Sequence, residues 1–171
     1  NEKIILSGSY LGRVTIYQKK TWKKKYQIND HLNKPITCIV INDNLNVWGS
    51  ACMDGFVNIY TYPTNKKIIS FKMESTALFA DYLFIISSPL PSFTIFSKNN
   101  LSFYCYSLQG KLINKEYDEG GDIISPIIFK EFSFNEHLLY GNNNGSVSIR
   151  FLPSLNLFSS IEINDNNIDC V

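Results

Sequence analysis

One pattern returns along this chain at a nearly constant interval. The segments Gly12–Tyr17, Gly55–Tyr60 and Gly145–Arg150 each place a valine two residues after the glycine and an isoleucine two residues later. The first two glycines are 43 residues apart and the next two are 90 apart, which is two intervals of 45. Self-similarity at a fixed interval indicates that one structural unit is repeated.

A degenerate copy of the pattern between Gly55 and Gly145, and a second pattern, both agree with this interval. Asn100–Cys105 follows Gly55 by 45 residues, with asparagine, which tolerates a positive φ, in the position of the glycine. The segments Ile36–Ile39, Ile124–Ile127 and Ile168–Val171 are separated by 88 and then 44 residues. Short alternating strands in units of 40 to 45 residues are typical of propeller blades. We therefore predict an all-β, WD40-like β-propeller with about four four-stranded antiparallel blades.

The turn residues predict how the strands are joined and where the blades begin. Asp54-Gly55 and Asn144-Gly145 are dipeptides of two-residue hairpin turns, in which both central residues take a positive φ. The predicted blades cover residues 1–30 (partial), 31–72, 73–119 and 120–163, and residues 164–171 begin a further blade. Because the chain starts without methionine and is cut out of phase with its repeats, we expect a segment of a larger propeller, with closure into a small ring as the alternative.

The composition excludes several classes of protein. The net charge is only +1, which argues against a protein that neutralises many nucleic-acid phosphates. The charge is uneven: residues 1–34 hold eight basic side chains and two acidic ones, whereas residues 111–171 hold four basic and nine acidic ones. The sequence has no apolar run long enough to span a bilayer and no signal peptide, and its four cysteines form no C-x-x-C pair. We expect a cytoplasmic protein without cofactors.

His31 is the most suggestive polar residue. It precedes the second predicted blade, Ser50 lies in the second strand of that blade, Asp54 lies in the next turn, and Tyr60 ends the third strand. This arrangement predicts a structural hydrogen-bond network like the one that stiffens WD40 blades, with tyrosine in place of tryptophan. A catalytic triad of His31, Ser50 and Asp54 is the alternative, but hydrogen-bond satisfaction alone explains the spacing.

The strongest charge feature is a basic run in the first predicted blade. An outer strand protected from edge pairing by lysine explains it most simply. A contact with an acidic partner or with anionic lipid headgroups is the sharper hypothesis, since each lysine near such a surface contributes on the order of 1 kcal/mol. The residues of this run are Lys19, Lys20, Trp22, Lys23, Lys24 and Lys25.

A second polar cluster surrounds Gly120-Gly121. Asp118, Glu119 and Asp122 lie close together in the sequence but lack the ligand spacing of a calcium loop. The two histidines are also too few for a multi-histidine metal site. We expect a solvated loop between blades and no metal site.

Three segments resemble a known family. Ala80–Pro91, Phe103–Ile113 and Tyr140–Arg150 look like the C-terminal WD40 region of BEACH-domain proteins, the relatives of neurobeachin and the Chediak-Higashi protein. No blade ends in the Trp-Asp dipeptide of WD40 repeats, and the BEACH domain is not in the sequence. The resemblance implies a large cytoplasmic scaffold that associates peripherally with membranes and acts in vesicle trafficking.

The sequence therefore predicts a protein-interaction scaffold and not an enzyme. Its expected partners are other proteins, the rest of its own parent chain (the BEACH domain and further blades) and an anionic membrane surface, but not nucleic acid. The alternative is a propeller enzyme, or a propeller that binds a ligand or glycan, with its site at the central channel.

Overall fold

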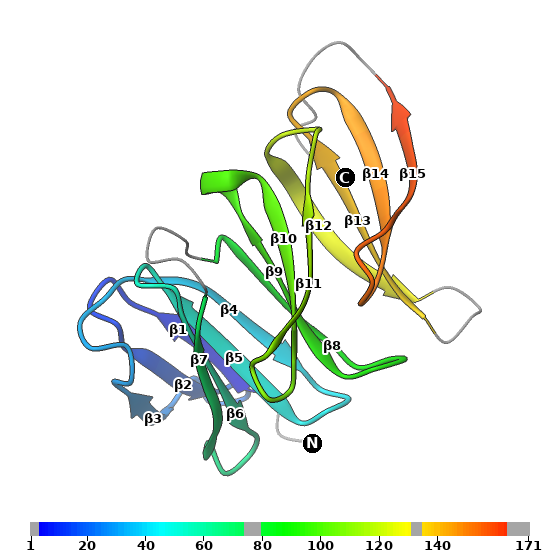
Figure 1. Cartoon of the computed structure of the whole chain (residues 1–171). Helices are drawn as coiled ribbons and strands as arrows, with labels where there is room; N and C mark the ends of the chain where they lie inside the picture. The colour runs from blue at the N-terminus through cyan, green and yellow to red at the C-terminus, as the bar shows by residue number, and fades with distance from the viewer. Residues whose placement is uncertain (1–3, 74–79, 131–134, 164–171) are drawn as a thin grey trace. The chain divides into compact units, whose positions relative to one another are not determined.

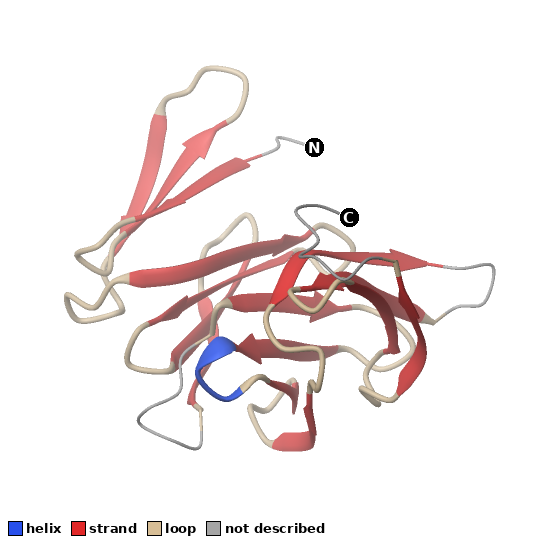
Figure 2. Ribbon diagram, turned by 90° about the horizontal axis from the view of Figure 1, so that it is seen from above, coloured by secondary structure: helices blue, strands red, loops and turns tan. Residues whose placement is uncertain are grey.

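The computed structural model describes residues 4–73, 80–130 and 135–163, and these residues form an all-β structure (Figures 1 and 2). Fifteen strands and a single 3-10 turn, η1 (Lys98–Asn100), make up its regular structure. No helix in the described ranges is long and apolar enough to cross a membrane. The predicted strand at Ile168–Val171, and with it the start of a further blade, lies outside the described residues.

The strands form four antiparallel sheets, and each sheet uses strands that are consecutive in the sequence. Sheet 1 has three strands and sheets 2, 3 and 4 have four each. The members are, for sheet 1, β1 (Ile4–Gly8), β2 (Val14–Gln18) and β3 (Lys24–Ile28); for sheet 2, β4 (Ile36–Asn42), β5 (Val47–Cys52), β6 (Phe56–Thr61) and β7 (Lys67–Lys72); for sheet 3, β8 (Tyr82–Ile86), β9 (Ser92–Ser97), β10 (Ser102–Ser107) and β11 (Leu112–Tyr117); and for sheet 4, β12 (Ile123–Lys130), β13 (Glu136–Asn142), β14 (Ser146–Phe151) and β15 (Leu157–Glu162).

The chain divides into two compact units, residues 1–83 and 84–171, and the boundary falls within β8. Sheets 1 and 2 belong to the first unit, and sheet 4 and most of sheet 3 belong to the second.

The same turn recurs once in every sheet. The backbone N–H of Gly12, Gly55, Leu101 and Gly145 each donates to the carbonyl three residues earlier, and each of the four residues has a positive φ. In sheets 2 and 4 the turn closes a three-residue loop, and in sheets 1 and 3 it lies in connections of five and four residues. Repetition of this turn in all four sheets accounts for the glycine periodicity of the sequence.

Two sequence-based expectations about these turns are wrong. Leu101, with φ of 51°, and not Asn100, takes the position of the glycine in sheet 3, because Asn100 ends the 3-10 turn η1. The loops after β5 and β13 contain three residues, and only their glycines, Gly55 and Gly145, have a positive φ. Asp54 and Asn144 therefore occupy ordinary turn positions rather than the strained centre of a two-residue hairpin.

A β-bulge also recurs at one position. The register shifts just before Tyr17, Tyr60, Tyr106 and Arg150, where β2 pairs with β3, β6 with β7, β10 with β11 and β14 with β15. These residues lie five positions after the four turn residues, so they occupy equivalent positions. A bulge redirects the side chains beside it.

The two faces of each sheet differ. We call the face that carries the repeated valine and isoleucine the valine face, and the opposite face, which carries the residue after the bulge, the network face. In sheet 1, Val14 and Ile16 on the valine face pack against Trp48 and Tyr60 on the network face of sheet 2. In the second unit, the ring of Phe103, which occupies the valine position of sheet 3, lies 5.4 Å from the ring of Tyr140 on the network face of sheet 4. Each unit therefore buries a valine face against the network face of the next sheet.

Candidate functional site

A polar network links the segment before sheet 2 to the network face of that sheet. The Tyr60 hydroxyl donates to Asp30 Oδ2 over 3.0 Å, and Lys67 Nζ lies 3.1 Å from the same oxygen. His31 Nε2 lies 2.8 Å from Ser50 Oγ and 3.3 Å from Asn58 Nδ2. The network therefore holds the residues just before β4 against the middle strands of the sheet.

Burial favours the neutral forms of two groups in this network, His31 and Tyr60. It lowers the pKa of His31 from 6.5 to about 4, with Asp30 opposing the change. Burial also raises the pKa of the Tyr60 hydroxyl, and the negative charge of Asp30 raises this pKa further. His31 is therefore a neutral imidazole at neutral pH and serves as a hydrogen-bonding partner rather than a cation.

The structure brings three of the four predicted network residues to this place. His31 contacts Ser50 directly, Tyr60 binds Asp30, the residue before His31, and Asp54 instead pairs with Lys34 at 3.6 Å on the surface. A Ser-His-Asp triad needs a carboxylate on the second ring nitrogen of the histidine. Among the described residues, His31 Nδ1 has no hydrogen-bond partner, so this geometry is not that of a triad.

A second network is centred on Asp118 in the second unit. Asp118 Oδ2 accepts from the Tyr140 hydroxyl at 2.5 Å and from Arg150 Nη2 at 3.1 Å, and Oδ1 accepts from Asn142 Nδ2 at 3.0 Å. Arg150 also donates through Nε to the Tyr140 hydroxyl at 2.6 Å, and its guanidinium lies 5.0 Å from the centre of the Phe103 ring. The exposed fractions are 3% for Asp118 and 6% for Arg150.

This network corrects the expectation of a solvated loop at residues 118–122. Asp118 is a buried, ion-paired carboxylate, whereas Glu119 is exposed and Asp122 forms a surface ion pair with Lys98 at 3.5 Å. The sequence contained a signal for this arrangement. Arg150 occupies the repeat position that Tyr60 occupies in sheet 2, and an arginine at a buried position needs a carboxylate nearby.

The two networks share one element, which we call the carboxylate clamp. In sheet 2 the residue after the bulge, Tyr60, binds Asp30, and in sheet 4 the equivalent residue, Arg150, binds Asp118. Both aspartates precede the first strand of their sheet by five or six residues. The clamp therefore fixes the entry of the chain into a sheet in two places, with different side chains performing the same task.

Three cysteines lie in the described part of the chain: Cys52 and Cys105 are buried, and Cys38 is half-buried. Burial raises the pKa of Cys38 to about 12 and also raises the pKa of Cys52 and Cys105. A nucleophilic or metal-binding cysteine requires the thiolate form, which burial disfavours. Within the described ranges, no group of three histidine, cysteine or acidic side chains could hold a metal ion.

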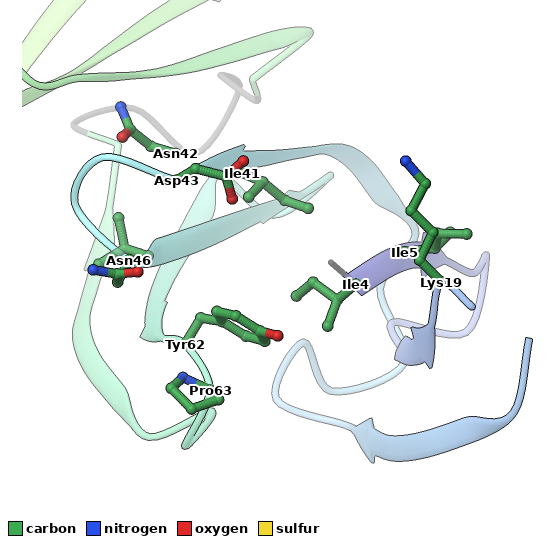
Figure 3. Close-up of a pocket in the computed structure, with 10 residues that line it drawn as sticks. Ile4, Ile5, Lys19, Ile41, Asn42, Asp43, Asn46, Tyr62 and Pro63 are labelled. Carbon is green, nitrogen blue, oxygen red and sulfur yellow. The ribbon is translucent and has the colours of Figure 1, made fainter. Parts of the chain in front are cut away.

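The first unit contains a groove of about 590 Å³ beside β1 and the ends of β4 and β5 (Figure 3). Ile4, Ile41 and Tyr62 supply apolar walls, and Lys19 and Asp43 supply one charge of each sign. A second cavity, of about 620 Å³ in the second unit, is lined by Arg150, by the acidic residues Glu116, Asp118 and Glu119, and by several hydroxyl and amide side chains. In the second cavity, Asp118 is held by Arg150 and the Tyr140 hydroxyl.

The predicted basic run forms the end of the β2–β3 hairpin. Lys19, Lys20 and Lys23 are exposed in the connection, and Lys24 and Lys25 are exposed on β3, which is an edge strand. Trp22 is 71% exposed and has φ of 57°. We call Lys19–Lys25 the basic hairpin. It presents five ammonium groups and an indole ring to solvent within seven residues.

No protein-family model and no curated protein matches this chain.

Proposed function

We propose that this chain is a segment of a WD40-like β-propeller and serves as a non-catalytic protein-interaction scaffold. The observation that carries the proposal is the recurrence of one sheet design, with the same turn and the same bulge in all four sheets and the carboxylate clamp in two. Repeated four-stranded sheets that bury one face against the next are the building principle of propellers. Such a framework holds its loops and edges rigidly for partners to bind.

The state of the titratable groups supports a scaffold rather than an enzyme. Active sites shift pKa values so that a nucleophile or base is poised for reaction. Here the large pKa shifts of His31, Cys38 and Tyr60 all favour the neutral form, and burial is the main cause of each. The polar groups of the networks bind one another and so hold the sheets in place.

The basic hairpin supplies a contact surface for this scaffold. We assign it to an anionic membrane surface, where five lysines at about 1 kcal/mol each give several kcal/mol of attraction. Trp22 adds an amphipathic ring of the type found at membrane–water interfaces. The role suits a cytoplasmic, peripherally membrane-associated protein of the BEACH type in vesicle trafficking, with further blades and the BEACH domain as partners in its parent chain.

Co-sedimentation with vesicles tests this role. Wild-type protein should bind vesicles that contain phosphatidylserine, and the triple substitution of Lys23, Lys24 and Lys25 by glutamate should abolish binding. The matched control replaces Lys66, Lys72 and Lys111, exposed lysines elsewhere, by glutamate, and changes the net charge equally. Equal binding by the two triple variants would show that the hairpin is not the contact site.

A further inference from the structure

The basic hairpin carries one hydroxyl group among its lysines. Thr21 is the middle residue of the connection between β2 and β3, it is exposed, and it is the one serine or threonine within Lys19–Lys25. Hydrogen bonds inside the connection place this hydroxyl. Thr21 Oγ1 donates to Gln18 Oε1 at 3.0 Å and accepts from the backbone N–H of Lys23 at 3.4 Å. The hydroxyl therefore lies at the exposed end of the hairpin, where an enzyme can reach it.

All the charges on both sides of Thr21 are positive. Two lysines precede it directly, and three more follow within four residues. The sequence contains no acidic residue between Glu2 and Asp30. Lys24 Nζ donates to the neutral side-chain oxygen of Gln27, so this contact does not compensate the lysine charge. A phosphate on Thr21 would therefore be the first negative group in a continuous basic stretch of the chain.

We propose that Thr21 is a phosphorylation site at which a protein kinase weakens the membrane contact of the basic hairpin. The inference rests on the membrane role proposed above and names the regulation of that same surface. The phosphoryl donor is ATP with Mg²⁺. A bond forms between the γ-phosphorus and Thr21 Oγ1, the bond to the β-phosphate oxygen breaks, ADP leaves, and the hydroxyl proton passes to a carboxylate of the kinase. Lysines on both sides of Thr21 fit a kinase whose substrate groove is acidic.

The phosphate opposes membrane binding through its charge. It carries up to two negative charges at neutral pH, which reduces the charge of the hairpin from +5 to about +3. Its oxygens also accept hydrogen bonds from neighbouring ammonium groups, which are then less available to lipid headgroups. Trp22 follows directly in the chain and is 71% exposed, so a tryptophan ring at the interface brings the phosphate against anionic headgroups. Two charges lost at the surface should weaken binding about 30-fold, or about 2 kcal/mol.

Semisynthesis provides the phosphorylated chain without a kinase. A peptide thioester of residues 1–37 with phosphothreonine at position 21 joins residues 38–171 by native chemical ligation, because residue 38 is a cysteine. The refolded product is compared with the same chain lacking the phosphate, on vesicles that contain phosphatidylserine. The phosphorylated chain should bind about 30-fold more weakly at low salt, and added salt should reduce the difference.

Three substitutions separate the charge from the loss of the hydroxyl. Thr21→Val removes the hydrogen bond to Gln18 without adding charge, and it should bind vesicles like the wild type. Thr21→Glu adds one negative charge and should weaken binding about fivefold. Asn29→Asp is the matched control, since it adds the same charge at an exposed position just beyond the opposite end of β3. It should bind vesicles nearly as well as the wild type, because surface charges separated by more than about 10 Å are largely screened.

A kinase reaction tests whether the hairpin is a substrate. The wild-type chain is incubated with ATP, Mg²⁺ and a serine/threonine kinase that prefers basic substrates. Fragmentation mass spectrometry should locate the main phosphate at Thr21. The variant with Lys23, Lys24 and Lys25 replaced by glutamate should be phosphorylated much more slowly at Thr21, since it lacks the ammonium groups that an acidic groove binds.

Three results would overturn the inference. Equal vesicle binding by the phosphorylated and unphosphorylated chains would show that the phosphate does not control the contact. Binding by Thr21→Val as weak as that of the phosphorylated chain would assign the effect to the lost hydroxyl. Absence of phosphate at Thr21 after the kinase reaction would show that the hairpin is not a substrate. All three leave the membrane role standing, whereas an unmodified chain that does not bind vesicles contradicts that role and this inference with it.

Discussion

Removal of the Asp118 carboxylate should strongly destabilise the second unit. Asp118 and Arg150 are 3% and 6% exposed, and the ion pair between them measures 3.1 Å. Asp118→Ala leaves the guanidinium buried without its counter-ion and also deprives Tyr140 of its acceptor. Breaking a buried pair from one side typically costs about 3 to 5 kcal/mol. With an m-value of about 2 kcal/mol per molar urea, the urea midpoint should fall by roughly 2 M.

Urea unfolding, followed by circular dichroism, measures this effect, and the chain offers a matched control. Asp54 forms a 3.6 Å ion pair with Lys34, and both side chains are more than 40% exposed. Asp54→Ala should therefore cost less than about 1 kcal/mol. The double variant Asp118→Ala/Arg150→Met, which removes both buried charges, should recover most of the loss. A cost for Asp118→Ala no larger than that for Asp54→Ala would refute the claim that this pair fixes the sheet.

Further predictions concern the first network and the repeated turn. Burial lowers the pKa of His31 in the folded chain, so His31 contributes to the free energy of unfolding above pH 6.5 and this contribution is lost as the pH falls toward 4. The change in pKa from 6.5 to about 4 corresponds to at most about 3 kcal/mol of stability. Urea titrations at pH 7 and pH 4.5 should show a smaller acid loss for His31→Gln than for the wild type, and equal losses would contradict the assignment. Leu101→Gly should raise the thermal midpoint, because glycine relieves the left-handed backbone at this position. Gly55→Ala should reduce the free energy of unfolding by about 1 kcal/mol and so lower the thermal midpoint. Effects of one sign at both positions would exclude a shared turn.

The four-sheet organisation could be predicted from the sequence because turn residues and alternation are local signals. The interval between Gly12, Gly55 and Gly145 marks one turn per sheet, and the strands found agree closely with the alternating runs. The misassignment of Asn100 has a physical reason. In sheet 3 the loop itself contains a 3-10 turn, which moves the left-handed position by one residue, onto a leucine that has no intrinsic preference for it.

The polar networks were only partly predictable, because they join residues far apart in the sequence. His31 and Ser50 were found through an expected family arrangement, but Asp30, which lies beside His31 and binds Tyr60, was not. Asp118 was misjudged because three acidic residues around two glycines suggest a solvated loop, and its partner Arg150 lies 32 residues away. Whether an acidic residue is solvated or buried depends on the packing of sheets, which a local pattern does not contain.

Distances between equivalent outer strands test the propeller architecture most directly. Ile68, Ile113 and Phe158 are the second residues of β7, β11 and β15, and all three are about half exposed. Spin labels on cysteines at these positions, with Cys170 replaced by serine, allow pulsed electron resonance to measure each pair. Radial stacking predicts similar distances for 68–113 and 113–158, and a 68–158 distance clearly shorter than their sum. A 68–158 distance equal to that sum would mean a linear stack and would contradict the account.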